Sequence, residues 1–172
     1  MGVGQDIAAE LELKKYYPKC NFLALDPVAD VNAELVEKQL NGKRQFDNNF
    51  NELSIGFFDF FQYYNDKSVI DLLIVDVDGS EYAIFQLLAE KYEQLPVTVC
   101  QMNIEFHNQP LYGSFFKRHR FFRNFDWFIR HGRFALMKTD SINVTYDPKS
   151  YIYHRMFFVN LFDIVCLEKF LF

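Results

Sequence analysis

Three carboxylates follow an apolar run in the middle of the chain. Residues 72–82 read LLIVDVDGSEY, which places Asp76, Asp78 and Glu81 close together in the sequence. The apolar run is typical of a strand buried on both faces, and residues that follow such strands lie at the carboxyl edge of a parallel sheet, where ligands bind. A carboxylate at that edge can attack phosphorus as a nucleophile, or it can line the site of another ligand.

The first of these chemistries is that of magnesium-dependent phosphatases of the haloacid dehalogenase type. In that pattern Asp76 would attack phosphorus and Asp78 would act as general acid and base. The pattern normally opens its fold, whereas about 70 residues precede it here, and no later acidic pair suited to magnesium follows. The phosphatase is therefore the less favoured alternative.

A second pattern lies at the start of the chain. Gly2 and Gly4 stand just before a predicted helix, and Asp26 follows the next predicted strand, 22 residues after Gly4. In nucleotide-binding α/β units such glycines let the backbone approach the ligand, and the acidic residue accepts hydrogen bonds from the ribose hydroxyls. Ile7 stands where a dinucleotide site has a third glycine, which favours an adenosyl ligand without a pyrophosphate. The alternative is an ordinary helix-start loop with a solvated aspartate.

The elements that position these residues alternate between strand and helix along the chain. This order predicts an α/β fold with a mainly parallel sheet flanked by helices and an antiparallel final strand pair. We expect a loop over residues 43–52. The predicted helices are 6–17, 29–40, 58–64, 80–93 and 114–131, and the predicted strands are 21–25, 53–58, 70–75, 97–106, 133–138 and 156–162.

These stretches together resemble the FkbM-type branch of S-adenosylmethionine-dependent methyltransferases. The resemblance covers most of the chain and rests on GVGQD, LALDP, DLLIVDVDGSEY and NIEFH, although Asp78 stands where the family's Asp-x-Glu-Gly-x-Glu pattern has glutamate. It implies a Rossmann-like fold, S-adenosylmethionine as methyl donor, and O-methylation of a small hydroxyl-bearing or sugar-like acceptor. The alternative from outside enzymology is a non-catalytic relative that keeps the fold and acts by binding.

The resemblance and the strand-end positions together assign roles to individual residues. We expect catalysis from Asp76, Glu105 and His107, because an imidazole titrates near neutrality and can take a proton from a hydroxyl. The non-functional alternatives are that His107 forms a hydrogen bond to a loop carbonyl, and that Glu81 only stabilises the first turn of its helix through the helix dipole. The expected binding residues are Gly2, Gly4, Asp26 and Asp76 for the donor, and Asp78 and Glu81 for the acceptor.

Length and composition limit the remaining possibilities. The 172 residues suit one methyltransferase-like domain over 1–172, and since this fold places a strand before its glycine loop, we expect that first strand to be missing at the N-terminus. The net charge of −5 gives no support for nucleic-acid binding. We find no apolar run of the ~18 residues that a membrane span needs. The N-terminus lacks the charged-then-apolar pattern of a secretory signal peptide, so the expectation leans to a cytoplasmic location.

The cysteines and one basic segment complete the sequence expectations. Cys20, Cys100 and Cys166 are far apart and odd in number, which predicts buried thiols rather than a disulfide framework, and no metal site is predicted. The segment 114–133 interleaves aromatic with basic residues. Such a segment can bind single-stranded nucleic acid by phosphate contacts and base stacking, but we expect a helix that covers the sheet and has a basic outer face. That face could instead meet an anionic substrate, a membrane surface or a partner. The residues expected on its core-facing stripe are Phe115, Phe122, Phe125 and Ile129.

Overall fold

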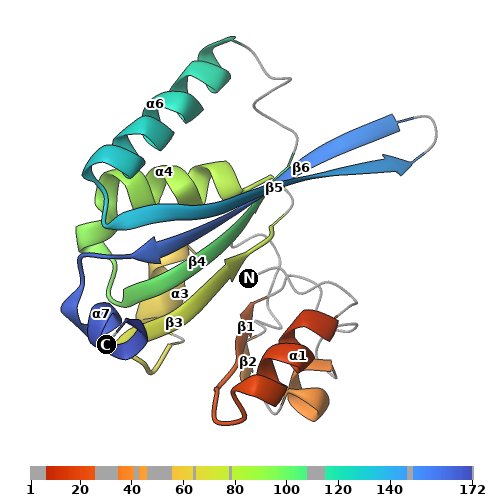
Figure 1. Cartoon of the computed structure of the whole chain (residues 1–172), viewed down its shortest axis with the longest axis vertical. Helices are drawn as coiled ribbons and strands as arrows, with labels where there is room; N and C mark the ends of the chain where they lie inside the picture. The colour runs from red at the N-terminus through yellow and green to blue at the C-terminus, as the bar shows by residue number, and fades with distance from the viewer. Residues whose placement is uncertain are drawn as a thin grey trace. The chain divides into compact units, whose positions relative to one another are not determined.

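The chain falls into two compact units, Met1–Asn65 and Asp66–Phe172, which are described one at a time (Figure 1). The prediction that residues 1–172 form one domain stays a prediction. Gly2, Gly4, Asp26 and Asp78 lie outside the residues that the structure describes. The computed structural model describes residues 7–25, 35–40, 43–45, 56–63, 65–77, 79–107, 115–146 and 149–171.

The first unit combines short strands with helical segments. Strand β1 (Leu23–Leu25) pairs in parallel with β2 (Lys43–Gln45), so the loop predicted from residue 43 onward is wrong at its start. The predicted strand over 53–58 is wrong at its end, because Phe57 begins a helix. The remaining elements of the unit are α1 (Ala8–Tyr16), the short π-helical segment η1 (Leu35–Gln39) and α3 (Phe57–Tyr63).

Helix α3 forms where the sequence is ambiguous between strand and helix. Its buried side chains are Phe57, Phe60 and Phe61, which follow the i, i+3, i+4 spacing of one helix face. The rings of Phe57 and Phe61 meet edge to face with centroids 5.2 Å apart. This packing along one face favours the helix over the strand that aromatic residues otherwise prefer.

The second unit is built on a mixed sheet. Its described strands are β3 (Val69–Val75), β4 (Thr98–Phe106), β5 (Phe134–Tyr146) and β6 (Lys149–Asn160), and they lie in the order β3-β4-β6-β5. Strands β3 and β4 are parallel, and β6 runs antiparallel to both β4 and β5. The α/β, Rossmann-like architecture and the antiparallel final pair are as the sequence predicts.

Helices α4 (Glu81–Lys91) and α6 (Phe115–His131) lie side by side against this sheet, and the short helix η2 (Tyr92–Gln94) follows α4 (Figure 1). Their shared core is aromatic. Phe85 of α4 is fully buried and its ring lies 4.7 Å from that of Phe128, between centroids, while Phe106 and Phe158 contact it from the sheet. This cluster holds α4 against α6 and the sheet, and so helps to position the residues at the N-terminus of α4.

The core-facing stripe predicted for α6 is wrong at Phe122 and Ile129, whereas Phe125 does pack toward the core, with its ring 6.0 Å from that of Phe85 between centroids. Phe122 is 54% exposed and Ile129 is 38% exposed, whereas Asn124 and Phe128 are buried. The buried residues follow i, i+4 spacing and pack toward α4. Phenylalanines occur all around this helix, so the sequence pattern alone does not single out the inner face.

The chain ends in a helix that the sequence analysis did not predict, α7 (Ile164–Phe170). The side chain of Asp163 caps it by accepting a hydrogen bond from the Val165 backbone N–H. A disulfide joins Cys166 of α7 to Cys100 of β4, so the expectation of buried thiols is wrong for this pair. Among the described residues, Cys20 is the cysteine that keeps a free thiol. Within the described parts of the chain, no helix is both long enough and apolar enough to cross a bilayer.

Candidate functional site

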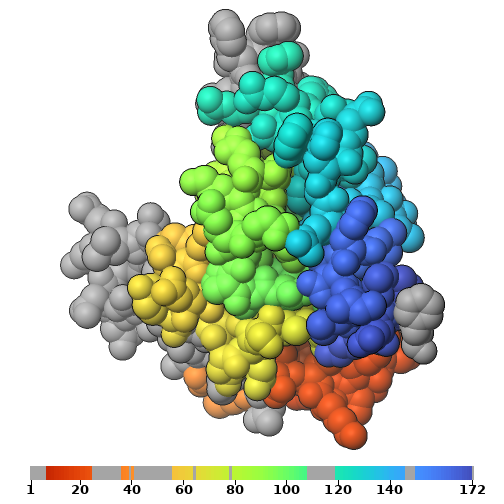
Figure 2. All heavy atoms as spheres, turned by 90° about the vertical axis from the view of Figure 1, so that its left-hand side faces the viewer, coloured from red at the N-terminus to blue at the C-terminus, as the bar shows by residue number. Residues whose placement is uncertain are grey.

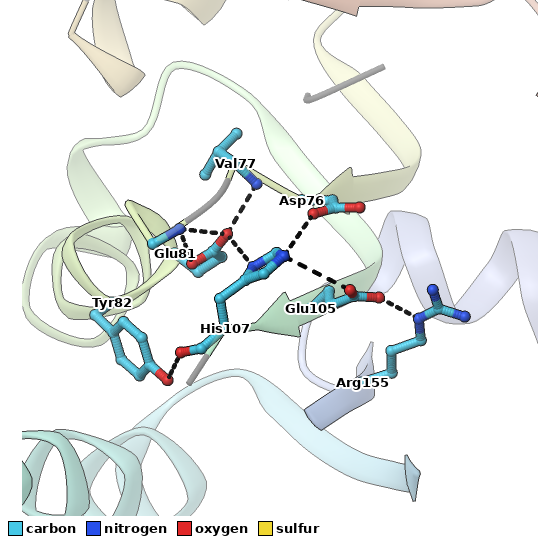
Figure 3. Close-up of polar contacts among 8 residues, drawn as sticks. Asp76, Val77, Glu81, Tyr82, Glu105, His107 and Arg155 are labelled. Carbon is cyan, nitrogen blue, oxygen red and sulfur yellow. Dashed lines mark hydrogen bonds and ion pairs between the residues drawn. The ribbon is translucent and has the colours of Figure 1, made fainter. Parts of the chain in front are cut away.

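Polar side chains meet where the two parallel strands of the second unit end (Figure 3). Asp76 directly follows β3, while Glu105 lies near the end of β4 and His107 comes just after it. The register pairs Val75 with Ile104, so the two strand ends lie at the same edge of the sheet. This is the edge at which ligands bind in parallel α/β sheets.

Glu81, the first residue of α4, connects the turn after β3 to His107 at the end of β4. Its side chain has 0% exposure and accepts hydrogen bonds from the backbone N–H groups of Val77, at 2.8 Å, and Gly79, at 2.8 and 3.1 Å. Gly79 adopts a φ of 108°, which a side chain would strain. The glycine and glutamate of the DVDGSE motif therefore form one unit, in which a tight turn supplies donors to a buried carboxylate.

Glu81 also fixes the tautomer and orientation of His107. Its Oε1 lies 2.9 Å from His107 Nδ1, and because a carboxylate only accepts hydrogen bonds, the proton belongs on Nδ1. The other ring nitrogen, Nε2, then lies 3.5 Å from Asp76 Oδ1 and 3.7 Å from Glu105 Oε1. The imidazole therefore presents its basic nitrogen to a pair of carboxylates.

Tyr82 anchors the backbone of His107. Its hydroxyl donates a hydrogen bond to the His107 carbonyl oxygen at 2.5 Å. Burial raises the pKa of Tyr82, and the negative charge of Glu81 raises it further. The hydroxyl therefore stays protonated and acts as a donor throughout the physiological pH range.

Glu105 is positioned by an arginine that the sequence analysis missed. Arg155 of β6 lies directly opposite Glu105 of β4, and its Nε donates to Glu105 Oε2. The Glu105 side chain is buried, whereas that of Arg155 is half-exposed. The only signal for Arg155 is the strand register, which is not visible before β6 is known to pair with β4.

The structure brings together four of the predicted site residues, Asp76, Glu81, Glu105 and His107 (Figure 3). Asp76, Glu81 and His107 each offer one possible metal ligand, within 4.8 Å of one another. The Glu81 carboxylate, however, already accepts from two backbone N–H groups and from His107. These contacts favour orientation of the imidazole over coordination of a cation.

An acidic edge with an oriented imidazole, on a Rossmann-like sheet, is an arrangement suited to enzymes that act on small molecules. Residues 3–134 of the chain match the family model for the methyltransferase FkbM domain. The chain therefore belongs to the FkbM methyltransferase family, which confirms the family predicted from the sequence. Neither the curated proteins nor the solved structures contain a match. Membership favours a methyltransferase over the phosphatase alternative.

Proposed function

We propose that the chain is an S-adenosylmethionine-dependent methyltransferase that O-methylates a small hydroxyl-bearing or sugar-like acceptor. The observation that carries this proposal is the imidazole of His107, which is held by buried Glu81 and directs Nε2 toward the strand-end carboxylates. An imidazole oriented in this way has the geometry of a general base.

The proposed roles follow from the contacts. When bound, S-adenosylmethionine would supply a methyl carbon whose bond to the positively charged sulfur breaks as the acceptor oxygen bonds to that carbon, and S-adenosylhomocysteine would leave. Nε2 of His107 would take the proton of the acceptor hydroxyl. The resulting imidazolium then lies beside Asp76 and Glu105, whose negative charges stabilise it. Arg155 keeps Glu105 in place, and Glu81 acts as a positioning residue for His107 rather than as the acceptor contact expected from the sequence.

The donor assignment rests on sequence and family. Gly2, Gly4 and Asp26 have the types and spacing of an adenosyl site, and the family match over residues 3–134 includes Gly4 and Asp26 but not Gly2. Asp76, with a side chain 44% exposed at the strand edge, is proposed to face the donor or the acceptor, and Asp78 the acceptor. Among these residues, Asp26 is proposed to contribute most to the affinity for the donor, because it would accept hydrogen bonds from both ribose hydroxyls.

The first test is calorimetric titration of the folded chain with S-adenosylhomocysteine. We expect saturable binding, and we expect Asp26→Ala to weaken it by about 1–3 kcal/mol, because ribose hydroxyls lose their acceptor. Unchanged affinity in the variant would remove Asp26 from the site. A folded chain that binds no S-adenosylhomocysteine would favour the non-catalytic relative.

The second test concerns the proposed base. Candidate hydroxyl acceptors are screened by release of S-adenosylhomocysteine, and His107→Gln is then compared with the wild type on the acceptor found. We expect kcat to fall by about 10²–10⁴-fold, with unchanged affinity for S-adenosylhomocysteine. The matched control is His119→Gln, which changes an exposed histidine of α6 and should leave kcat unaltered.

A further inference from the structure

Helix α6 carries a basic and aromatic stripe on its outer side. Arg120, Arg123, Trp127 and Arg130 follow one another at spacings of three, four and three, so they lie along one side of the helix. All four side chains are exposed, and Trp127 is 52% exposed. Figure 2 shows the spheres of α6 open at the surface, above those of α4.

Packing in the second unit does not account for this stripe. The inner side of α6 is occupied by Asn124 and Phe128, which are buried against the unit's core. Within the part of the chain that the structure describes, Arg130 pairs with Asp126 at 2.7 Å, and no ion pair joins Arg120 or Arg123 to another side chain. Two basic groups and a large indole are therefore left facing outward.

We propose that the outer side of α6 binds the surface of an anionic lipid bilayer. The charge of this helix is complementary to anionic lipid, because residues 119–131 hold three arginines against one aspartate. The local excess of positive charge contrasts with the net charge of −5 of the whole chain. Arginine side chains reach lipid phosphates, and indole rings favour the headgroup region, where one edge is apolar and the other is wet. Exposed Phe122 and Ile129, on the other flank of the same helix, add apolar side chains that bury at the acyl boundary.

A bilayer fits these residues better than a nucleic acid does. The Trp127 ring is stacked on His131, with centroids 4.1 Å apart and planes 15° apart, so one ring face is already covered and unable to stack on a base. Ile129 has no aromatic face and gains nothing from a nucleotide. Both residues gain from contact with lipid, because that contact requires apolar area rather than an open ring face.

The test uses Trp127, which is the only tryptophan in the sequence, as its own reporter. The full chain is mixed with phosphatidylcholine vesicles that contain phosphatidylserine, and with vesicles of phosphatidylcholine alone. We expect the emission of Trp127 to shift to shorter wavelength, and to be quenched by brominated lipids, with the anionic vesicles only. Sedimentation with the vesicles gives the partition coefficient.

Two charge variants make this test specific. Each arginine neutralised on the stripe should lower the partition coefficient about fivefold, so Arg120→Gln with Arg123→Gln should lower it about 30-fold. Lys67→Gln with Lys138→Gln changes the net charge equally at two exposed positions outside α6, and should leave the coefficient within about twofold. Circular dichroism confirms that each variant is folded.

Several outcomes would overturn the proposal. They are no emission change with a folded chain, equal binding to both kinds of vesicle, or equal losses in the two charge variants. Binding of a labelled oligonucleotide that is lost in the stripe variant, with no vesicle binding, would assign the stripe to nucleic acid instead. None of these readouts depends on a methyl donor, so their failure leaves the proposed methyltransferase activity untouched.

Discussion

Glu81 is the residue on which the geometry of the candidate site depends most. It is fully buried, and its carboxylate is the common acceptor for two backbone N–H groups of the preceding turn and for His107. We expect Glu81→Gln to lower the free energy of unfolding by about 2–3 kcal/mol, because an amide has one acceptor oxygen in place of two and loses the charge. Urea denaturation measures this change.

The same variant has a second, more specific readout. In the wild type, nitrogen-15 correlation spectra of the histidine rings should place the His107 proton on Nδ1, and in Glu81→Gln that preference should be lost. Glu90→Gln alters an exposed acid on the same helix and serves as the control, with an expected change within about 0.5 kcal/mol. A His107 tautomer that is the same in both proteins would contradict the positioning role of Glu81.

Gly79 should tolerate a side chain poorly. Its φ of 108° lies in the left-handed half of backbone space, where a Cβ costs about 1–2 kcal/mol, and its N–H is bonded to Glu81. We expect Gly79→Ala to reduce stability by that amount in chemical denaturation. At Gly56 an added Cβ would meet only the carboxylate end of the exposed Asp59 side chain, so Gly56→Ala is a milder matched change. Equal losses in the two variants would show that backbone strain at Gly79 is unimportant.

The raised pKa of Tyr82 predicts that the free energy of unfolding falls at alkaline pH. Burial, followed by the charge of Glu81, raises the pKa of Tyr82 in the folded chain above its ordinary value of 10.0. Its contribution to stability is therefore full below about pH 10 and is lost as the pH rises further, because the unfolded chain releases the proton first. Tyr82→Phe should flatten the decline in unfolding free energy between pH 9 and about 11. Tyr63→Phe, at an exposed position, should leave the slope as it is.

At the scale of elements, we expect α7 to depend on its covalent link to the sheet more than on the exposed ion pair between Lys169 and Asp71 of β3. Most of its side chains are exposed, and Cys166 is the residue that is buried. The bond to Cys100 closes a loop across a sequence separation of 66 residues, so its loss should destabilise the chain by about 2–4 kcal/mol. We expect Cys100→Ala with Cys166→Ala to speed amide hydrogen exchange over 164–170 before the rest of the unit. Cys20→Ala is the matched control, and comparable exchange in both variants would show that the bond does not hold the helix.

The sequence predicts the buried elements well and the exposed ones poorly. Strands β3 and β4 follow from apolar runs, since burial on both faces leaves a direct signal in composition. Strands β5 and β6 extend far beyond their predicted limits through polar residues such as 139–145. There the antiparallel ladder between the two strands supplies the stability, and single-strand composition does not report that pairing.

The site could be predicted in part for the same reason. The sequence predicts that Asp76, Glu105 and His107 lie together, because residues at the ends of buried parallel strands meet at one edge of the sheet. The contact of Glu81 with His107 joins α4 to the end of β4, and that of Arg155 with Glu105 depends on antiparallel register. Both contacts join elements that are distant in the sequence, so the spacing of residues within one motif cannot predict them.

At the scale of the whole molecule, charge is distributed unevenly. The chain is acidic overall, and carboxylates surround the basic nitrogen of His107, whereas the outer side of α6 is basic. The match to the FkbM domain covers residues 3–134, and so includes the α6 stripe as well as Asp76, Glu81, Glu105 and His107, while Arg155 lies beyond it. Because the acidic strand edge and the basic outer side of α6 use different residues, the two proposed functions can be tested by separate variants.

Whether the Cys100–Cys166 disulfide has formed in a given sample depends on the redox environment in which the chain folded. Glutathione keeps thiols reduced in the cytosol, while secretory compartments let such bonds form and persist. A chain that folded under oxidising conditions would show a single titratable thiol after denaturation without reductant, that of Cys20, and a chain from a reducing compartment would show all three. Thiol titration of the protein isolated from its native cells would therefore identify its folding environment from the chain itself.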